Sequence, residues 1–461
     1  MQNARKVAIV ILTYNNIEYS KQCLESIREN TEKGTYEILV VDNQSTDGTR
    51  EWLLEQTDIR LKMNEKNEGF PKGCNMGIAM AGEDCDILLL NNDTIVTPGW
   101  LANLQACLYS SDAIGAAGAV CNHNENLQGI GFYYNDLDQM KAFAEKNNVS
   151  DSGRWEEKIF LIGFCILIKR EVLNQIGLLD ERYSPGYVED NDLGLRIAAA
   201  GYRLMLCHDC FIHHYLGSGF RKDLSRFYPV LYANREYFKS KWGFDTFAFD
   251  DIKYASLRII NEPDKYKKMH VLELGCGIGV TLLKMKHDYP GAVLFGAEQN
   301  ENMAKIAGRV ASVAVQKNGE FPDCFERESF DFILIGNRLE TVENPEAFLA
   351  QAKDYLKPGG YIIGTVQNLA HYGVMRSILG GNWLYASQNT VNTANRTFFT
   401  GDDIMQLFLK CGYINPYIFH WFSVPTEEEK AFIKQLCEAG REKSEYTYTT
   451  YLYSVKFQKP L

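Results

Sequence analysis

The stretch Asp86-Ile87-Leu88-Leu89-Leu90-Asn91-Asn92-Asp93-Thr94 decides the fold of the first half of this chain. Its consecutive apolar residues predict a strand buried on both faces, as in a parallel sheet. The strand ends abruptly at short polar side chains. Because ligands of open α/β sheets bind beyond the carboxyl ends of the strands, we expect Asp93 beside a charged ligand. Asp93 can hold a divalent cation that neutralises a diphosphate, or it can merely end the strand in an Asx turn.

Strands and helical patterns alternate on both sides of this stretch, as is typical of βαβ units around a parallel sheet. The predicted strands at residues 6–12 and 37–41 both end at short polar side chains. A Gly-rich loop, residues 67–77, then opens a further helix. Backbone N–H groups of such a loop can approach a phosphate, and Lys72 adds a positive charge. Each segment alone fits a surface turn, and the order of the segments is what favours a binding site.

The overall composition limits the class of protein. A chain of 461 residues suggests about two or three domains. Its 46% hydrophobic and 23% charged residues are ordinary for a soluble globular protein. A net charge of -11 without a basic stripe argues against nucleic-acid binding. The longest apolar run, residues 159–168, includes a Gly and is too short to form a transmembrane segment.

The start of the chain and its cysteines indicate a compartment. A strand pattern begins at Lys6, so we expect no signal peptide. The 12 Cys residues have no framework spacing, which fits a reducing cytoplasm. We therefore expect a cytoplasmic protein, either free or held peripherally at the inner face of the membrane. Cys207-x-x-Cys210, followed by His213 and His214, resembles part of a zinc site, but the absence of a matching second cluster disfavours zinc.

A series of ordered motifs covers roughly residues 5–245. The motifs are VILTYN (10–15), VVDNQSTDGT (40–49), NEGF (67–70), LLLNNDT (88–94), GFC (163–165), IGLLDE (176–181), EDNDL (189–193) and HHYLGSG (213–219). Together they resemble family 2 inverting glycosyltransferases, especially rhamnosyltransferase-like members. This resemblance implies a GT-A-type fold that binds a nucleotide sugar.

The resemblance assigns roles to the polar residues of these motifs. Asp42 would accept a hydrogen bond from the imide of the nucleotide base. Asp93 would be the metal ligand of the family's Asp-x-Asp motif, in which Asn91 here replaces the first Asp. His213, or less likely His214, would complete the Mn²⁺ or Mg²⁺ site. The nucleotide-sugar-binding residues would be Thr13, Tyr14, Asn15, Asp42, Ser45, Gly69, Lys72 and Asn92.

The acidic cluster at 189–192 is the candidate for the catalytic base. Inversion needs a carboxylate that takes the proton of the acceptor hydroxyl as that hydroxyl attacks the anomeric carbon. We assign this role to Asp190, with Glu189 beside it in the catalytic pair. Repulsion among Glu189, Asp190 and Asp192 would raise the proton affinity of at least one of them. The alternative is a helix N-terminus whose acids only complement the helix dipole.

A second βαβ pattern begins after a segment near residue 250 that is not Pro- or Ser-rich. We place domains at residues 1–250 and 251–461. The pattern opens with MHVLELGCGIG (269–279), in which G-x-G-x-G follows a strand, unlike the G-x-G-x-x-G of dinucleotide-binding proteins. The next strand ends at Glu298, whose carboxylate could accept hydrogen bonds from both hydroxyls of a ribose. Further strands are predicted at 330–335 and after LKPGG (356–360).

These features together resemble a class I S-adenosylmethionine-dependent methyltransferase over roughly residues 255–461, with late antiparallel strands at 447–456. The family's His-x-Leu-Glu-His motif is Asn337-Arg338-Leu339-Glu340-Thr341 here and lacks both histidines. The acid usually found beside the adenine is not evident at 315–320. His371 and Tyr372 are candidates for a base. By resemblance, S-adenosyl-L-methionine would contact Glu273, Gly275, Cys276, Gly277, Gly279 and Glu298.

The sequence thus predicts an α/β protein with two Rossmann-like domains, a GT-A-type domain followed by a class I methyltransferase domain. One hypothesis is a bifunctional enzyme that transfers a sugar, such as rhamnose, from a dTDP- or UDP-sugar to a glycan or glycoprotein acceptor and then O-methylates the glycan. The alternative is a glycosyltransferase whose second domain only binds or docks. A nicotinamide oxidoreductase is disfavoured by the glycine spacing.

Overall fold

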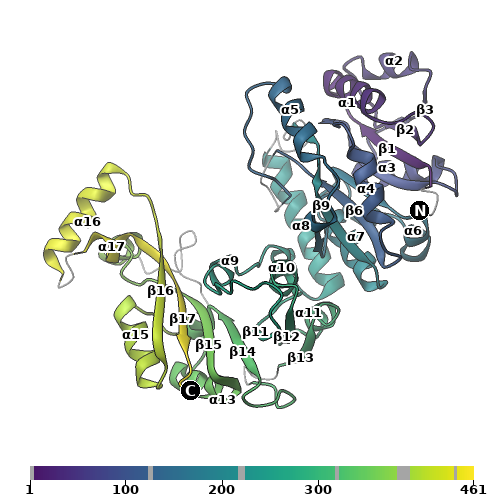
Figure 1. Cartoon of the computed structure of the whole chain (residues 1–461). Helices are drawn as coiled ribbons and strands as arrows, with labels where there is room; N and C mark the ends of the chain where they lie inside the picture. The colour runs from purple at the N-terminus through teal and green to yellow at the C-terminus, as the bar shows by residue number, and fades with distance from the viewer. Residues whose placement is uncertain (1–4, 123–127, 216–223, 317–320, 382–394, 441–443) are drawn as a thin grey trace. The chain divides into compact units, whose positions relative to one another are not determined.

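The computed structural model divides the chain into two compact units, Met1–Asp250 and Asp251–Leu461, each described by itself (Figure 1). The described residues are 5–122, 128–215, 224–316, 321–381, 395–440 and 444–461. Within these ranges, no helix is both long enough and apolar enough to cross a membrane. Parts of two expected motifs, at 216–219 and 317–320, lie outside them.

An eight-stranded sheet forms the centre of the first unit, with strand order β3-β2-β1-β4-β8-β6-β9-β7. A separate two-stranded ribbon pairs β10 with β5. The bounds are β1 Val7–Thr13, β2 Tyr36–Asp42, β3 Ile59–Met63, β4 Asp86–Asn91, β5 Thr94–Ile95, β6 Ile114–Val120, β7 Trp155–Lys158, β8 Cys165–Ile168, β9 Arg203–Phe211 and β10 His213–His214.

The register of the central strands explains why their polar ends gather at one edge. β1 lies between β2 and β4 and is parallel to both. Thr13 is opposite Asp42, and Leu12 is opposite Asn91. The strands therefore end together, and the residues that follow them share one edge of the sheet. The predicted strand at the opening stretch is confirmed as β4, which is buried along its length up to Asn91.

Helices cover both faces of this sheet, so the apolar strands are buried on both sides. One core cluster joins one face of the strands to α1, α2 and α4, and a second joins the other face to α3, α5, α6 and α7. The helix bounds are α1 Ile17–Asn30, α2 Thr49–Leu54, α3 Phe70–Met80, α4 Trp100–Leu108, α5 Leu137–Asn147, α6 Arg170–Ile176, α7 Glu189–Ala199 and α8 Leu224–Trp242.

The glycines inside α3 serve packing. A Cβ atom at Gly73 would overlap the side chain of Leu12, and one at Gly77 would overlap that of Val10. Both partners are on β1, so these glycines let α3 lie close against the strand. The sequence predicted that the backbone of this loop approaches a phosphate. In the structure, Gly73 and Gly77 are needed for a different reason, which is the close packing of α3 on β1.

A seven-stranded sheet forms the second unit, with order β13-β12-β11-β14-β15-β17-β16 and with β17 antiparallel to both of its neighbours. The parallel strands at its centre and the late antiparallel strand confirm the predicted α/β class. The strand bounds are β11 Met269–Leu274, β12 Ala292–Glu298, β13 Ser312–Val315, β14 Phe330–Gly336, β15 Leu356–Gln367, β16 Ile414–Phe422 and β17 Thr450–Gln458.

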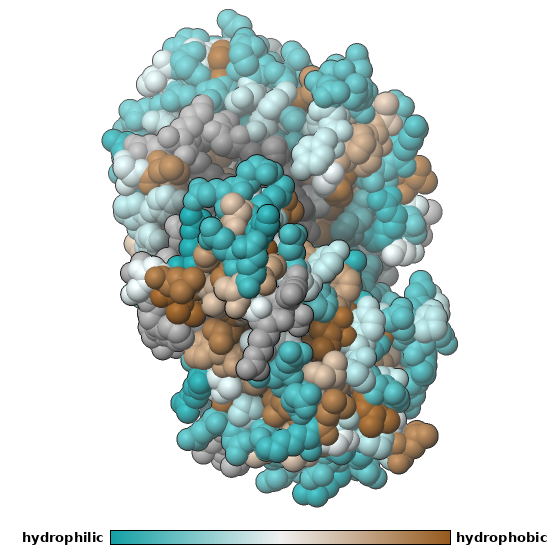
Figure 2. Space-filling model, turned by 90° about the vertical axis from the view of Figure 1, so that its left-hand side faces the viewer, coloured by the Kyte–Doolittle hydropathy of each residue, from teal (hydrophilic) through white to brown (hydrophobic). Residues whose placement is uncertain are grey.

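Helices again cover the central strands on both faces. Residues of α10 pack on one face, and residues of α13 and α15 pack on the other. The edge strand β16 is more exposed, with Tyr417 and Phe422 about half accessible. Figure 2 shows hydrophobic residues in small groups between hydrophilic ones. The helix bounds are α9 Tyr254–Leu257, α10 Val280–Asp288, α11 Glu301–Ala307, α12 Arg338–Thr341, α13 Pro345–Tyr355, α14 Tyr372–Leu379, α15 Gly401–Lys410, α16 Glu427–Ala439 and α17 Glu445–Thr449.

Candidate active sites

Asp42, at the end of β2, is fully buried and held by several donors. Its carboxylate accepts hydrogen bonds from the Thr13 hydroxyl at 3.2 Å and from the Ser45 backbone N–H at 3.0 Å. Arg50 Nη1 lies 3.0 Å from the same carboxylate. The structure therefore places Asp42 where β1 and β2 end, as expected. Its predicted contact with a nucleotide base stays a prediction, because in this state its oxygens face protein donors.

The two loops that follow β1 and β2 are joined by side chains. Ser45 Oγ accepts from the Asn15 backbone N–H at 2.8 Å, and Asn15 Oδ1 accepts from the Thr46 backbone N–H at 2.7 Å. Asn15 has a φ of 58°, in the left-handed region that Asn tolerates better than most residues. Tyr14, by contrast, leaves half of its surface exposed. The predicted residues thus form a fixed rim with one accessible aromatic ring.

The rest of the predicted nucleotide-sugar set lies near the start of α3 and the end of β4. Gly69, the residue before α3, has a φ of 84°, and its carbonyl accepts a hydrogen bond from Asn43 at 3.1 Å. Lys72 Nζ pairs with Glu68 at 2.7 Å, so its charge is already partnered. Asn92 Nδ2 donates to Ser20 Oγ at 2.9 Å. A phosphate contact by Lys72 stays a prediction and would have to replace or share this ion pair.

The structure distinguishes between the two adjacent histidines. His214 Nε2 lies 3.2 Å from Asp93 Oδ1. His213 instead places Nδ1 against the Tyr134 hydroxyl. Burial alone would lower the pKa of His214, but its hydrogen bonds to Asp93 and Cys121 outweigh this effect and raise the pKa to about 9. His214, the alternative to the preferred His213, is therefore the histidine in contact with the expected metal-binding carboxylate, and the choice of metal ligand stays a prediction.

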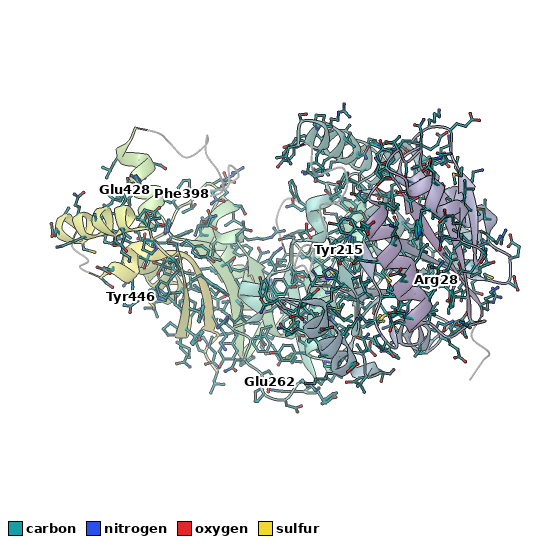
Figure 3. All side chains as sticks on the ribbon, turned by 90° about the horizontal axis from the view of Figure 1, so that it is seen from above. Arg28, Tyr215, Glu262, Phe398, Glu428 and Tyr446 are labelled. Atoms are coloured by element: carbon teal, nitrogen blue, oxygen red, sulfur yellow. The ribbon has the colours of Figure 1, made fainter. Side chains whose placement is uncertain are left out.

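Neighbouring side chains fix the position of His214. Its ring stacks on Phe164, with centroids 5.1 Å apart. Asn91, whose backbone N–H donates to the Phe164 carbonyl, also approaches His214 Nε2 with its side-chain nitrogen, at 3.5 Å. Tyr215, labelled in Figure 3, stacks on Tyr19 of α1 with centroids 4.5 Å apart. This ribbon is therefore tied to both β4 and α1.

The residues beside Asp93 fit a divalent cation as a partial ligand set. Carboxylates suit Mn²⁺, and Mg²⁺ is often held by one or two carboxylates together with phosphate oxygens of the substrate. Imidazole is a common metal ligand in its neutral form, so an ion here would displace the proton that Asp93 stabilises on His214. Among the described residues, no three His, Cys, Asp or Glu side chains gather as a complete metal site. Cys207 and Cys210, from the sequence that resembles part of a zinc site, are buried in β9.

Glu189 and Asp190 lie at the start of α7, and the pKa values of both carboxyl groups are raised. Burial, followed by the charge of Asp190, raises the pKa of Glu189 to about 8. Burial also raises the pKa of Asp190, but backbone N–H groups of Asn191, at 2.8 Å, and Gly163, at 3.4 Å, oppose this shift. At neutral pH Glu189 therefore keeps its proton, and Asp190 is the better candidate for the ionised base.

Asp192 is occupied by structural contacts. Its fully buried carboxylate lies 2.6 Å from Lys241 Nζ and 2.8 Å from Arg196 Nε, and it accepts from Trp242 Nε1 at 2.9 Å. Two cations and an indole leave little room for proton transfer with a substrate. Asp192 instead joins α7 to the end of α8, which removes it as a strong alternative to Asp190.

The turn before the acidic pair is strained, and α8 holds it. Tyr187 and Val188 have φ values of 74° and 76°, which are costly for non-glycine residues and especially for a β-branched one. Asn234 Nδ2 on α8 donates to the carbonyls of Tyr183 at 2.7 Å, Gly186 at 2.8 Å and Tyr187 at 3.0 Å. Asn234 thus holds the strained turn that presents Asp190, and no motif in the sequence marked it.

In the second unit, the Gly-rich loop follows β11 as predicted. Gly275, Gly277 and Gly279 have φ values of 69°, 55° and 89°, which favour glycine. A Cβ atom at Gly277 would meet nothing within 4 Å, so this side of the loop is open to a ligand. Cys276 is buried beneath the loop. An open, left-handed glycine loop after a strand fits the nucleoside-containing cofactor that the sequence implied.

Glu298, at the end of β12, currently organises that loop. Its carboxylate accepts from the backbone N–H groups of Gly277 at 2.9 Å, Gln299 at 2.8 Å and Asn300 at 2.9 Å. Glu273, at the other side of the loop, is buried, and burial raises its pKa to about 7. Both predicted acids therefore lie beside the glycines, and their contacts with a cofactor stay predictions.

A cavity of about 930 Å³ opens next to this loop. Leu274, Gly275 and Gln299 line it from the loop side, and Asn337, Arg338 and Asn395 are among the residues that line it from elsewhere. Neither His371 nor Tyr372 is part of the lining. His371 instead contacts Ser423 Oγ through Nε2 at 2.9 Å. The suggestion that His371 or Tyr372 acts as a base therefore gains no support from their positions.

Glu340 occupies the Glu position of the family's His-x-Leu-Glu-His motif, whose two histidines are absent here, and it is a buried acid with structural contacts. Its side chain accepts from Asn395 Nδ2 at 3.1 Å and from the Gln367 backbone N–H at 3.3 Å. Burial raises its pKa to about 8. A largely protonated carboxyl group here joins α12 to the end of β15 and to Asn395, and α12 and Asn395 line the cavity.

Comparison with known proteins assigns both units. Residues 8–177 match the family model of glycosyl transferase family 2, and residues 244–415 match that of a methyltransferase domain. The chain joins a family 2 glycosyltransferase domain to a methyltransferase domain. The glycine loop and the cavity lie in the methyltransferase domain, whereas Asp42, Asp93 and Asp190 lie in the unit that contains the glycosyltransferase match.

Curated relatives include both a glycosyltransferase and a methyltransferase. The N-acetylglucosaminyl-diphospho-decaprenol L-rhamnosyltransferase of Mycobacterium tuberculosis is 27% identical over 42% of this chain and 71% of its own length. A ubiquinone biosynthesis O-methyltransferase of Cereibacter sphaeroides is 26% identical over 34% of this chain and 64% of its own length. A Sinorhizobium fredii protein is 25% identical over 54% of this chain, which spans 29% of that relative.

Among solved structures, the mannosyltransferase PcManGT from Pyrobaculum calidifontis, in complex with GDP-Man and Mn²⁺, has a TM-score of 0.36 and 22% identity. The match covers 47% of this chain and 59% of that structure.

Proposed function

We propose that the glycosyltransferase domain transfers a sugar from a nucleotide-sugar donor with inversion and that the methyltransferase domain methylates the glycan product. The observation that carries the first part is the pair Gly163 and Phe164. The Gly163 backbone N–H donates to Asp190, while Phe164 stacks on His214, which contacts Asp93. Two adjacent residues thus link the candidate base to the candidate diphosphate-binding end of the site.

In the proposed transfer, Asp190 accepts the proton of the acceptor hydroxyl as its oxygen bonds to the anomeric carbon. The bond from that carbon to the diphosphate oxygen breaks, and the nucleoside diphosphate leaves with the electron pair. Attack from the face opposite the leaving group inverts the anomeric configuration. Glu189, protonated at neutral pH, adds no second negative charge beside Asp190.

Asp93 and His214 would hold a Mn²⁺ or Mg²⁺ ion in this proposal. When bound, such an ion neutralises the charge that develops on the departing diphosphate. Tyr14, the exposed ring at the rim, would stack on the nucleotide base, and Asp42 would lie at its edge. Removing the divalent ion with EDTA should then abolish sugar transfer without unfolding the chain.

The donor and acceptor follow from resemblance and the named relative. The Asn91-Asn92-Asp93 motif and the mycobacterial rhamnosyltransferase favour a dTDP- or UDP-linked sugar, with rhamnose as the first candidate. The acceptor would be a glycan or glycoprotein.

The methyltransferase domain would take S-adenosyl-L-methionine on the glycine loop and methylate a sugar hydroxyl. A shared chain would keep the glycosylated product near the second site and raise its effective concentration there. The competing proposal, that this domain only docks the glycosyltransferase, shares the fold but requires no cofactor binding. S-adenosylhomocysteine binding by the intact chain distinguishes the two proposals.

The deciding experiment is a thermal-shift panel on the full chain with UDP, dTDP and GDP, each with and without Mn²⁺, and with S-adenosylhomocysteine. A ligand at 100 times its Kd stabilises by about 2.7 kcal/mol, which a melt detects easily. Metal-dependent stabilisation by dTDP or UDP and independent stabilisation by S-adenosylhomocysteine would support two active sites. A nucleotide response alone would favour the docking proposal, and no nucleotide response would contradict the first half.

A further inference from the structure

Arg338 extends into the methyltransferase cavity from the start of α12, directly after β14. The guanidinium lies against the glycine loop, because a Cβ atom built on Gly275 would be 3.0 Å from Arg338 Nη2 and 3.2 Å from Nε. Both residues line the 930 Å³ cavity. Arg338 therefore borders the space beside the glycine loop.

This guanidinium has no anionic partner among the residues that the structure describes. The acid whose charge acts on it is Glu298, which favours the protonated form of Arg338 without forming an ion pair. Glu298 cannot easily turn toward Arg338, because its oxygens already accept from the backbone of Gly277, Gln299 and Asn300. Burial lowers the pKa of Arg338, which is the expected effect of a desolvated cation that lacks a carboxylate partner.

The other charged residues of the cavity lining do not neutralise the positive charge of Arg338. Lys253 is paired with Asp251, so these two residues balance one another. Arg396 and Glu343 are exposed members of the lining. Among the described lining residues, Arg338 is thus the partly buried cation that forms no ion pair. A buried guanidinium is costly unless an anion and good hydrogen bonds accompany it.

We propose that Arg338 is the receptor for an anionic group, a carboxylate or a phosphate, of a ligand bound in this cavity. The planar guanidinium matches either group through paired N–H donors. The proposal rests on the proposed function, in which this cavity holds the methyl donor and the methyl acceptor. Two sources offer such chemistry, namely the carboxylate at the amino-acid end of the methyl donor and an acidic or phosphorylated acceptor glycan.

The position of Arg338 also couples the two substrates. The sulfonium of the methyl donor is positive, and a nearby unpaired guanidinium repels it. An anion on Arg338 removes this repulsion, so a bound acidic acceptor should tighten the binding of the positively charged donor. The neutral thioether of S-adenosylhomocysteine should respond much less. If the donor's own carboxylate is the anion, donor and product should instead depend on Arg338 equally.

The test measures binding by calorimetry to the full-length chain and to Arg338→Gln, Arg338→Lys and Arg327→Gln. Arg327 lies in the same unit and is exposed, so its variant is the matched control. The probes are S-adenosylhomocysteine, 5′-methylthioadenosine, which lacks the carboxylate, and inorganic phosphate. Thermal melts confirm that each variant folds, and Arg338→Lys keeps the charge while losing the paired donors.

Arg338→Gln should weaken one anionic probe by about 10- to 100-fold, the size expected for charge-assisted hydrogen bonds, with a smaller loss for Arg338→Lys. Loss for S-adenosylhomocysteine but not for 5′-methylthioadenosine assigns the site to the donor carboxylate. Loss for phosphate alone assigns it to the acceptor. Unchanged binding of both anions overturns the proposal.

Failure of the proposed function gives a different pattern. If the wild-type chain binds neither S-adenosylhomocysteine nor 5′-methylthioadenosine, methyl transfer is contradicted, and the phosphate arm still tests Arg338 by itself. If the wild-type chain binds no anionic probe at all, the anion site is overturned, whatever the response to 5′-methylthioadenosine.

Discussion

The two domains place polar residues at the carboxyl ends of parallel strands, but they treat charge in opposite ways. In the glycosyltransferase domain, Asp42 and Asp93 are already held by protein partners, Arg50 and His214. In the methyltransferase domain, Arg338 borders a cavity without an anionic partner. The first site is organised before its substrate arrives, and the second leaves one charge for the ligand to neutralise. Substitutions should therefore disturb chemistry in the first domain and affinity in the second.

The largest effect is expected for Asp190→Asn. Removing the group that accepts the proton should lower kcat for sugar transfer by about 10²- to 10⁴-fold, while nucleotide affinity stays nearly unchanged. Glu189→Gln is the matched control, because Glu189 is already protonated at neutral pH and should keep most of the activity. Transfer assays with calorimetry on both variants make the comparison. Full activity of Asp190→Asn together with loss in Glu189→Gln would move the base to Glu189.

In the methyltransferase domain, the corresponding change is Glu298→Ala. The loop would lose the acceptor of three backbone N–H groups, and the cofactor would lose its expected ribose partner. We expect S-adenosylhomocysteine to bind roughly 100-fold more weakly, with sugar transfer unaffected. Glu301→Ala, at the exposed start of α11, is the control. Equal loss of sugar transfer would mean that the two domains do not work as separate sites.

A smaller effect should follow from Asn234→Ala, which removes the donor that holds the carbonyls of Tyr183, Gly186 and Tyr187. The strained turn should relax and displace Asp190 by less than 1 Å. Because a displacement of 1 Å costs about 10²-fold in rate, we expect kcat to fall by about 10-fold. The free energy of unfolding should also fall by about 1–3 kcal/mol.

Lys239→Ala, on an exposed position of the same helix, should change neither value. A loss of stability in Asn234→Ala without any change in kcat would reduce Asn234 to a structural role.

Features that depend on a local sequence pattern could be predicted, whereas features that depend on contacts between distant segments could not. Strand ends such as Thr13, Asp42 and Asp93 were visible because a buried apolar run that stops at a polar residue is a local pattern. Asn234 and Arg338 were not assigned roles, because their importance depends on segments far away in the chain. The choice between His213 and His214 depended on the register of β10 against β5, which pairs His214 with Thr94. Adjacent strand residues face opposite sides, so a shift of one residue exchanges their roles.

The two Gly-rich motifs also show that a sequence pattern alone does not reveal what restricts a residue. Gly275, Gly277 and Gly279 adopt the left-handed conformations expected of a ligand-binding loop. Gly73 and Gly77, in an equally suggestive motif, are small because α3 lies against β1. A glycine pattern in the sequence records that space or conformation is restricted, but packing decides whether a ligand or a neighbouring strand imposes the restriction.

The last prediction concerns pH and tests the protonation of Glu189 without an activity assay. Glu189 has a folded pKa of about 8 against an ordinary value of 4.5. Between these values the folded state holds a proton that the unfolded state has released, so stability falls as pH rises from about 5 to 8. Glu189→Gln cannot lose this proton, and its melting temperature should decline less over that interval. Parallel curves for the variant and the wild type would show that Glu189 is ionised in the folded glycosyltransferase domain, and its neutral role beside Asp190 would then be wrong.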